Sequence, residues 1–186
     1  ELSLAGIAEQ LYVSEQTIYK DLTSLIQLLK SKYHFQALTL ENGKIHIDSD
    51  EVELRTLFYR IAKEEIYTSN KLMDLHLFQL AKDYVDLEEL NGIVDYVSCF
   101  CKGNDIILSD QLIYVISWMI FFTMIRVEND HPIQKEVQLF HHNDMLTKML
   151  KNLLADLRLR LNEADAHLLQ NYVETLGFYS SRQRSA

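Results

Sequence analysis

The 186-residue sequence is short of proline, glycine and cysteine, and each shortage excludes something. One Pro and five Gly leave few sites at which a helix has to end, so long helices are favoured. The two cysteines, Cys99 and Cys101, are too few for a disulfide scaffold, and on a helix their side chains point about 200° apart. Their spacing also fits no common zinc site. We therefore expect two reduced, buried thiols and no bound metal.

Positive charge is also scarce, because the formal net charge is −9. Residues 1–66 hold 7 Lys and Arg against 11 Asp and Glu, residues 67–84 hold 2 against 2, and residues 85–186 hold 9 against 14. No segment is basic overall, which counts against strong non-specific binding of nucleic acid. A basic surface confined to one helix is still compatible with this composition.

One apolar run resembles a membrane span but is too short for one. Leu112 to Ile125 is nearly all apolar, and Asp110 and Arg126 bound it. A transmembrane helix needs about 20 such residues, so we predict a buried helix of a soluble protein. The first residues show no secretory signal pattern. We expect a cytoplasmic protein without membrane contact.

The first 35 residues have the spacing of two short helices joined by a tight turn. Ser3 opens the first helix, and Ser14 fits the N-cap of the second. Apolar residues recur at helical spacing along both. We expect one buried face made of Leu4, Ile7, Ala8 and Leu11, and a second made of Ile18, Leu22, Leu25, Ile26 and Leu29.

A β-hairpin is predicted directly after these helices. Apolar and polar residues alternate at Leu38–Leu40 and again at Ile45–Ile47. Asn42-Gly43 lies between the two runs, and this dipeptide is the strongest local signal for a hairpin turn. Two helices followed by a two-stranded ribbon are typical of a winged helix.

The remaining sequence predicts helices only. Asp48-Ser49-Asp50, Asp86 and Ser109 are expected to cap helix starts. The predicted helices run over about 51–67, 71–84, from 86 onward, 110–127, 133–160 with a break near His142, and 163–178. The predicted fold is therefore mostly α: a winged helix-turn-helix domain over 1–66, a connecting helix over 67–84, and an all-α bundle over 85–186.

The start of the second helix is a candidate DNA-reading surface, because these positions face base edges in a helix-turn-helix. Gln pairs with adenine, Thr packs on the thymine methyl, and Lys and Tyr reach phosphates. The candidates are Ser14, Glu15, Gln16, Thr17, Tyr19 and Lys20, with Gln27 and the wing residue Lys44 as backbone contacts. The alternative is a winged-helix protein-interaction module that binds no DNA. RNA antitermination is disfavoured, because the small β domain of such proteins is missing.

Other chemistry finds little support in the sequence. No nucleotide-binding, metalloprotease or serine hydrolase motif occurs, so we expect neither an enzyme nor a cofactor. His141-His142 beside Asp144 suggests a metal site, but adjacent residues do not share a helical face, and a polar loop is favoured. Trp118 and the neighbouring phenylalanines Phe121 and Phe122 are expected to pack in a core rather than line a ligand pocket.

The first third of the chain resembles the Mga-type helix-turn-helix of bacterial transcription regulators. Their pattern LAEKL-x-VS-x-x-T-x-x-x-DL, with a wing that ends in G-I-x-I-x-G-x-E-x-x-x-R, is matched here at Ala8–Leu11, Val13-Ser14, Thr17, Asp21-Leu22, Gly43–Glu51 and Arg55. The glycine that normally follows the last strand is replaced by Asp48 or Ser49. The resemblance implies a winged helix that binds double-stranded DNA.

In that family a PTS regulation domain, a bundle of five helices, follows the DNA-binding part. Asp105–Ile133 is similar to its second helix and following loop, with Arg126 at the usual arginine. The resemblance implies an activator of carbohydrate-uptake or virulence genes, such as the mannitol- and lichenan-operon activators or the Mga-like regulators. It also implies a homodimer formed through the bundle, with phosphocarrier proteins of the phosphotransferase system as further partners.

The phosphorylation sites of the sugar-responsive members are missing. The positions of their two usual phosphoacceptor histidines hold Met119 and Tyr172. Regulation by phosphotransfer at these sites is therefore not implied, and the Mga-like branch is favoured. The histidines that remain in this part of the chain are expected to lie in loops or on the surface; they are His131, His141, His142 and His167.

Overall fold

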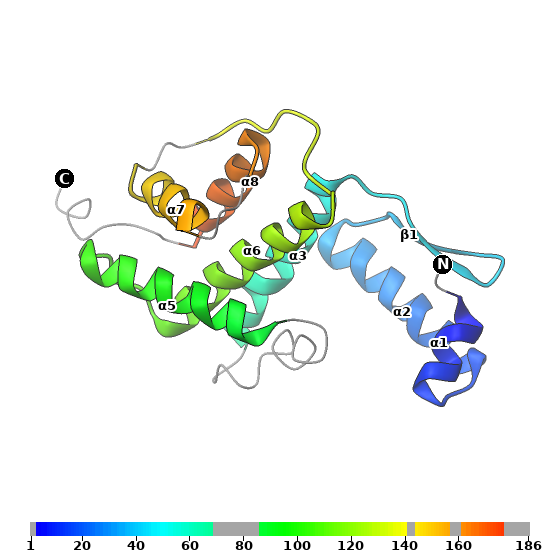
Figure 1. Cartoon of the computed structure of the whole chain (residues 1–186). Helices are drawn as coiled ribbons and strands as arrows, with labels where there is room; N and C mark the ends of the chain where they lie inside the picture. Colours follow the sequence, from blue (N-terminus) through cyan, green and yellow to red (C-terminus); the bar gives the residue numbers. More distant parts are fainter. Residues whose placement is uncertain (1–2, 69–85, 141–143, 157–160, 177–186) are drawn as a thin grey trace. The chain divides into compact units, whose positions relative to one another are not determined.

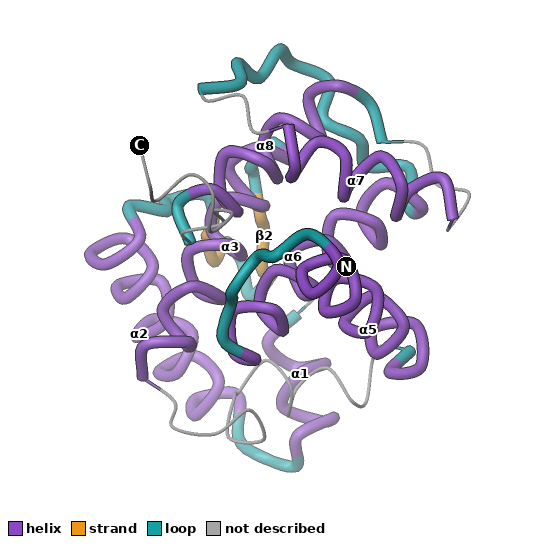
Figure 2. Tube along the Cα trace, turned by 90° about the vertical axis from the view of Figure 1, so that its left-hand side faces the viewer, coloured by secondary structure: helices purple, strands orange, loops and turns teal. Residues whose placement is uncertain are grey.

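The computed structural model describes residues 3–68, 86–140, 144–156 and 161–176. The chain forms two compact units, residues 1–57 (unit 1) and 58–186 (unit 2). The described residues are mostly helical, with one two-stranded antiparallel sheet that follows the first two helices (Figures 1 and 2). This arrangement confirms the predicted winged helix-turn-helix followed by a helical region.

Unit 1 contains the helix-turn-helix and the hairpin. It is built from α1 (Leu4–Leu11), α2 (Glu15–Tyr33), β1 (Leu38–Glu41), β2 (Lys44–Ile47) and the start of α3 (Glu51–Thr68). Helices α1 and α2 pack against each other through apolar side chains. The buried core consists of Leu4, Ala8, Ile18, Leu22, Leu29, Phe35 and Leu38. Amphipathic helices bury one stripe in this way and leave the opposite face to solvent.

Two residues that we predicted to be buried in unit 1 are exposed. Leu11 is 61% exposed, because α1 ends there and Tyr12 turns the chain with a φ of 55°. Leu25 is 43% exposed, since it lies at the edge of the buried face of α2. Helical spacing identifies the side of a helix on which a residue lies, but not how far the neighbouring elements extend over it.

The hairpin follows the sequence prediction. Its central residues Asn42 and Gly43 have φ values of 52° and 73°, the left-handed conformation that a two-residue turn of type I′ requires. Strands β1 and β2 pair from Leu38 opposite Ile47 to Glu41 opposite Lys44. The tip is fixed to the start of α1, because the Leu4 N–H donates to the Gly43 carbonyl at 2.9 Å.

Unit 2 is helical throughout its described elements. It contains the second half of α3 together with α5 (Leu87–Gly103), α6 (Asp110–Glu128), α7 (Asp144–Asp156) and α8 (Glu163–Glu174). Helix α6 packs against α5 and α8, and α7 packs against α5 and α8 as well. The predicted connecting helix at 71–84 lies outside the described residues, so the number of helices in the bundle stays a prediction.

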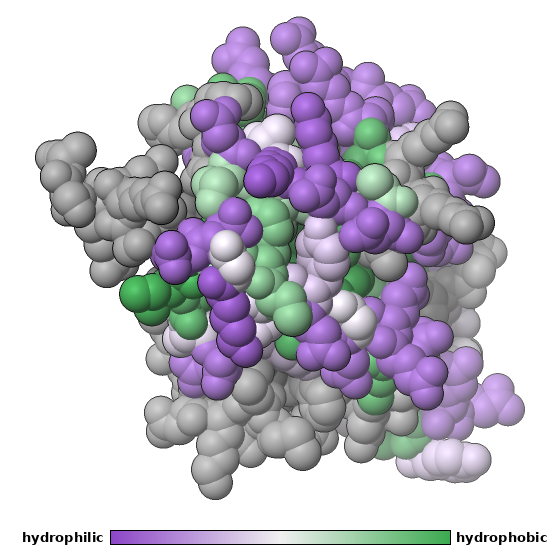
Figure 3. Space-filling view, turned by 60° about the vertical axis from the view of Figure 1, so that its left-hand side comes forward, coloured by the Kyte–Doolittle hydropathy of each residue, from purple (hydrophilic) through white to green (hydrophobic). Residues whose placement is uncertain are grey.

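Helix α6 is the core helix of unit 2. It is long and apolar enough to cross a membrane by length and composition, but 61% of its most apolar stretch is buried inside the structure. Trp118 and Phe121 are buried and meet edge to face, and Phe122 stacks on Phe58 of α3. These contacts confirm core packing. On the face shown in Figure 3, hydrophilic side chains predominate and apolar side chains form smaller patches between them.

The starts of α5, α6 and α8 in unit 2 lie where the sequence predicts them. Asp86 accepts hydrogen bonds from the Glu88 and Glu89 N–H groups, and Ser109 accepts one from the Leu112 N–H. At α8 the cap is reciprocal: the Asn162 side chain accepts from the Asp165 N–H, and the Asp165 carboxylate accepts from the Asn162 N–H. Such side-chain caps satisfy N–H groups that the first helical turn leaves without a partner.

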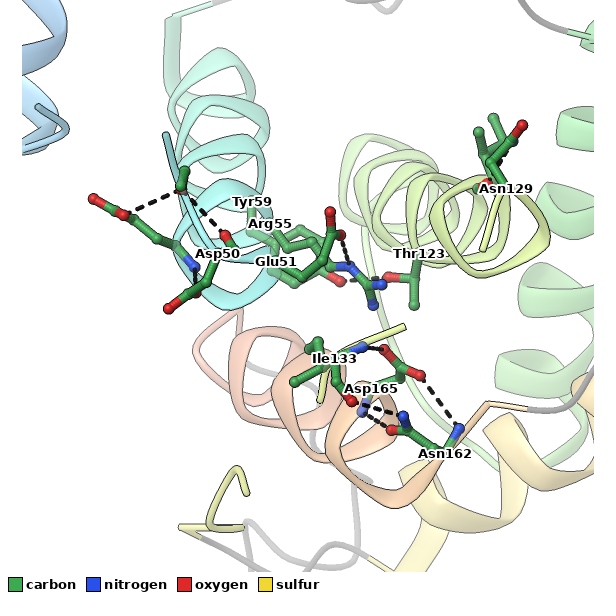
Figure 4. A network of polar contacts seen from close by, with 12 residues as sticks. Asp50, Glu51, Arg55, Tyr59, Thr123, Asn129, Ile133, Asn162 and Asp165 are labelled. Carbon is green, nitrogen blue, oxygen red and sulfur yellow. Dashed lines mark hydrogen bonds and ion pairs between the residues drawn. The ribbon is translucent and has the colours of Figure 1, made fainter. Parts of the chain in front are cut away.

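The helix predicted over 133–160 is wrong for residues 133–140, which form a non-helical segment, here named the strap. Side chains of α8 bind its backbone. Asp165 accepts from the Ile133 N–H at 3.0 Å, Asn171 accepts from the Phe140 N–H at 3.0 Å, and His167 Nδ1 donates to the Val137 carbonyl at 2.7 Å. Figure 4 shows the Ile133 end of this contact. Side chains of α8 therefore replace some of the backbone hydrogen bonds that a helix would have supplied here.

The two cysteines differ, and this corrects the expectation that both are buried. Cys101 faces the interior of unit 2, and burial raises the pKa of its thiol to about 11. Cys99 is exposed. Residues two apart on a helix point to opposite sides, so only one of the pair can face the core.

Candidate nucleic-acid interface

The turn between α1 and α2 is built from local hydrogen bonds. At the end of α1, the Val13 N–H donates to the Ala8 carbonyl at 3.0 Å. Ser14 then adopts an extended conformation (φ −78°, ψ 150°), and its Oγ accepts from the Thr17 N–H at 3.1 Å. A hydroxyl at this position stabilises the start of a helix by about 1 kcal/mol. The cap therefore fixes where α2 begins and which side chains it turns outward.

Polar side chains occupy the side of α2 opposite its core. At 100° per residue they lie between about 140° and 240° from the buried Ile18. We name this surface the outer face; it consists of Gln16, Lys20, Thr23, Ser24 and Gln27. All five are exposed except Thr23, which is half-buried. A rigid helix with a fixed apolar underside thus presents polar groups along three of its turns.

The chemistry of the outer face suits the edges of DNA bases. Gln16 and Gln27 carry amides, which both donate and accept hydrogen bonds. The hydroxyls of Thr23 and Ser24 donate to carbonyls of their own helix at 2.7 and 3.0 Å, so their oxygens remain acceptors. Lys20 adds the single cation of this face. Amides and hydroxyls are the groups that pair with adenine and with other base edges in the major groove.

The predicted site residues fall into three groups. Gln16 and Lys20 lie together on the outer face. Ser14 and Thr17 belong to the helix cap, with their hydroxyl oxygens 2.8 Å apart, although both are exposed. The other three point elsewhere or lie on another element: Glu15 in the first turn of α2, Tyr19 at 53% exposure beside the outer face, and Lys44 on β2.

Thr23 and Ser24 are outer-face residues that the sequence prediction missed. The prediction placed base contacts only in the first turns of the helix, where they are commonest, and further along α2 it named Gln27 alone, as a backbone contact. The signal was present in the sequence, because polar residues continue at spacings of three and four from Gln16 to Gln27. Extending the periodicity over the whole helix would have found them.

Arg55, which matches the arginine at the end of the family pattern, does not face solvent. Its side chain is fully buried, and its Nε donates to the Glu51 carboxylate at 3.1 Å (Figure 4). Both partners belong to α3, so the pair lies within one helix, and the buried guanidinium is not available for phosphate contact. Its place in the pattern is therefore structural.

Of the two positions that hold the usual phosphoacceptor histidines in other members, Met119 lies in the core of unit 2 and Tyr172 is half-buried. Met119 is fully buried, and the Tyr172 ring packs 5.2 Å from the ring of Tyr59. Among the histidines, His131 is exposed and His167 binds the strap, with its Nε2 3.7 Å from Glu163. The pair at 141–142 lies outside the described residues, so the preference for a polar loop over a metal site there stays a prediction.

Comparison with known proteins identifies the first unit. Residues 1–61 match the Mga helix-turn-helix domain. The match spans α1, α2, the hairpin and the first part of α3, and it confirms the resemblance for this segment. A Mga-type domain indicates a DNA-binding transcriptional regulator. No curated protein matches the sequence.

Proposed function

We propose that this chain is a cytoplasmic transcriptional activator that reads a promoter through the outer face of α2. The observation that supports this proposal is the placement of Gln16 and Lys20. Both are exposed on a capped helix whose opposite side is locked into the core of the Mga-type domain. A recognition helix needs this combination of a rigid support and outward polar groups.

Unit 2 serves in this proposal as the sensory and dimerisation part. Two copies joined through it would place two α2 helices about 34 Å apart, one turn of DNA. The genes controlled are those for carbohydrate uptake or virulence, as the resemblance implies, and phosphocarrier proteins are the further partners. The role is regulatory, and we propose no catalytic activity.

A winged helix that binds protein instead of DNA is the second candidate. The charge of unit 1 favours it, since residues 1–57 hold 5 Lys and Arg against 9 Asp and Glu. An acidic domain gains little from the phosphate backbone. If unit 1 does bind a specific DNA sequence, its affinity must come from base contacts and from Lys20 more than from the overall electrostatic field of the domain.

DNA binding decides between the two candidates. Duplexes are first selected from a random pool with the protein, and their affinity is then measured by fluorescence anisotropy against an unselected duplex. We expect Gln16→Ala to weaken binding to the selected sequence by about 1–3 kcal/mol and to leave the unselected duplex nearly unchanged. We expect Lys20→Ala to weaken both alike and to reduce the salt slope by about 1.

The matched control is Lys102→Ala, which removes an exposed lysine from unit 2 and should change neither affinity. Failure to bind any duplex at low salt would favour the protein-interaction module. An equal loss on both duplexes for Gln16→Ala would remove its assigned role in base reading.

A further inference from the structure

A second surface of α2 is separate from the outer face. It consists of Asp21, Leu25, Leu28 and Lys32, and we name it the α2 stripe. The two leucines are 43% and 48% exposed, and the two charged residues are exposed as well. At 100° per residue the four fall within an arc of about 60°, centred about 120° away from the outer face.

Two neighbouring exposed leucines with charged residues on both sides have the arrangement of a small interaction surface, which is apolar at its centre and polar at its rim. Here the flanks have opposite signs. Asp21 precedes the leucines by one turn, and Lys32 follows them by one turn. The Lys32 ammonium lies 5.2 Å from the centre of the Tyr33 ring and remains exposed.

The stripe is symmetric about its own centre. Its spacings are four, three and four residues, so the midpoint between Asp21 and Lys32 is also the midpoint between Leu25 and Leu28. If a second α2 is turned end to end, Asp21 faces Lys32 of the second copy and Leu25 faces its Leu28. A surface that is complementary to itself in this way is what a two-fold symmetric interface requires.

We propose that the α2 stripe is an interface between two copies of this chain, packed antiparallel about a two-fold axis. The four leucines exclude water at the centre, and two Asp21–Lys32 pairs close the ends. A parallel arrangement is disfavoured, because it would place Asp21 against Asp21 and Lys32 against Lys32. A contact this small gives weak, concentration-dependent association.

The interface also has a consequence for DNA binding, and this consequence alone rests on the proposed function. Packed helices have their axes about 8–10 Å apart. Recognition helices in successive major grooves are about 34 Å apart. One pair of α2 helices therefore cannot form the stripe contact and read two grooves together, so the stripe dimer is a form that operator DNA dissociates.

Charge exchange tests the interface without any DNA. Sedimentation velocity of the full chain is measured over a range of concentrations for the wild type, for Asp21→Lys and for Lys32→Asp. We expect each single variant to weaken one association step by about tenfold or more, because two attractive pairs become two like-charge contacts. An equimolar mixture of the two variants should regain the step, since each introduced charge then faces its opposite.

Two controls separate the interface from other effects. Lys30→Asp makes the same change in charge on another side of α2 and should leave association unchanged. The double variant Asp21→Lys/Lys32→Asp restores both pairs within a homodimer and should associate like the wild type. Circular dichroism of every variant checks that α2 remains helical.

The proposal is overturned if the wild type shows no association step that the single variants weaken, or if the mixture fails to regain it. In the first case the stripe is covered by a different protein or by another segment of the same protein. Either failure leaves the DNA measurements unaffected, because no nucleic acid enters the experiment. If unit 2 already forms a dimer, the stripe contact is observed as association of two dimers into a tetramer instead of two monomers into a dimer, and the expected effects of the variants are the same.

Discussion

Helices α2 and α6 are alike at their ends and opposite along their sides. Each has 19 residues, begins after a serine cap, carries an acidic residue in its first turn and has a basic residue in its last turn. Yet α2 buries three side chains and α6 buries eleven. Caps and dipole charges therefore determine where a helix starts and stops, whereas the distribution of apolar side chains determines what surrounds it.

Because the two helices differ in burial, we expect substitutions in α6 and substitutions in α2 to affect different properties of the protein. Helix α6 buries most of its side chains in the core of unit 2, so its substitutions should act on stability. Helix α2 buries one face and leaves its other sides exposed to solvent, so substitutions on its outer face should act on binding. This distinction is wrong if exposed positions of α2 prove as important for stability as the buried positions of α6.

The largest effect is expected from Ile120→Ala in α6. Ile120 is fully buried, and truncating such a side chain costs about 2–5 kcal/mol, because the cavity collapses only in part. The measurement is urea unfolding followed by far-ultraviolet circular dichroism, because both units are rich in helix and their unfolding is then detected together. The matched variant Leu28→Ala removes a leucine of α2 that is 48% exposed and should cost about 1 kcal/mol or less. Equal losses would contradict the comparison.

A smaller loss is expected from Asp165→Ala in α8. This fully buried carboxylate accepts from the Ile133 N–H at 3.0 Å and from the Asn162 N–H at 3.3 Å. Removing it leaves the buried Ile133 N–H without its acceptor, which costs about 1–3 kcal/mol. Urea unfolding measures the loss. Glu163→Ala, at an exposed position of the same helix, should stay within about 0.5 kcal/mol. If both variants behave alike, the contacts of Asp165 with the strap and with the cap of α8 contribute no stability.

The strap also shows where sequence reasoning ends. Caps at Ser14 and Ser109 and the Asn42-Gly43 turn were predicted, because each depends on residues a few positions away. The strap was not, because its backbone partners lie on α8 about 30 residues later and no local pattern announces them. The exposure of Leu25 has the same origin, since it depends on which elements reach that edge of α2.

The candidate site divides in the same way. Gln16 and Lys20 could be identified from their place after the cap, because helical geometry alone turns them outward. The hydrogen bond between the Ser14 and Thr17 hydroxyls could not be predicted, because it depends on the side-chain conformations of both residues. Arg55 shows the converse: as an arginine near the wing it suggests phosphate contact, but burial assigns it to the ion pair with Glu51.

The two serine caps provide an intermediate test, in which α2 and α6 should behave alike. Ser14→Ala and Ser109→Ala each remove a hydroxyl that accepts from a first-turn N–H, which costs about 1 kcal/mol. Hydrogen exchange read by mass spectrometry should show faster exchange at the Thr17 N–H and the Leu112 N–H, respectively. Unchanged exchange in one helix would mean that packing, not the cap, fixes its start.

The smallest effect on stability is expected from Gln27→Ala on the outer face of α2. Gln27 is exposed, and alanine favours helix at least as well as glutamine, so the free energy of unfolding should change by about 0.5 kcal/mol or less. Affinity for the selected DNA should fall nonetheless if the proposed function holds, because the outer face then loses an amide that contacts the duplex. Urea unfolding and anisotropy on the same preparation measure both quantities. A loss of stability with unchanged affinity would mean that the outer face supports the fold, and α2 would then resemble α6 after all.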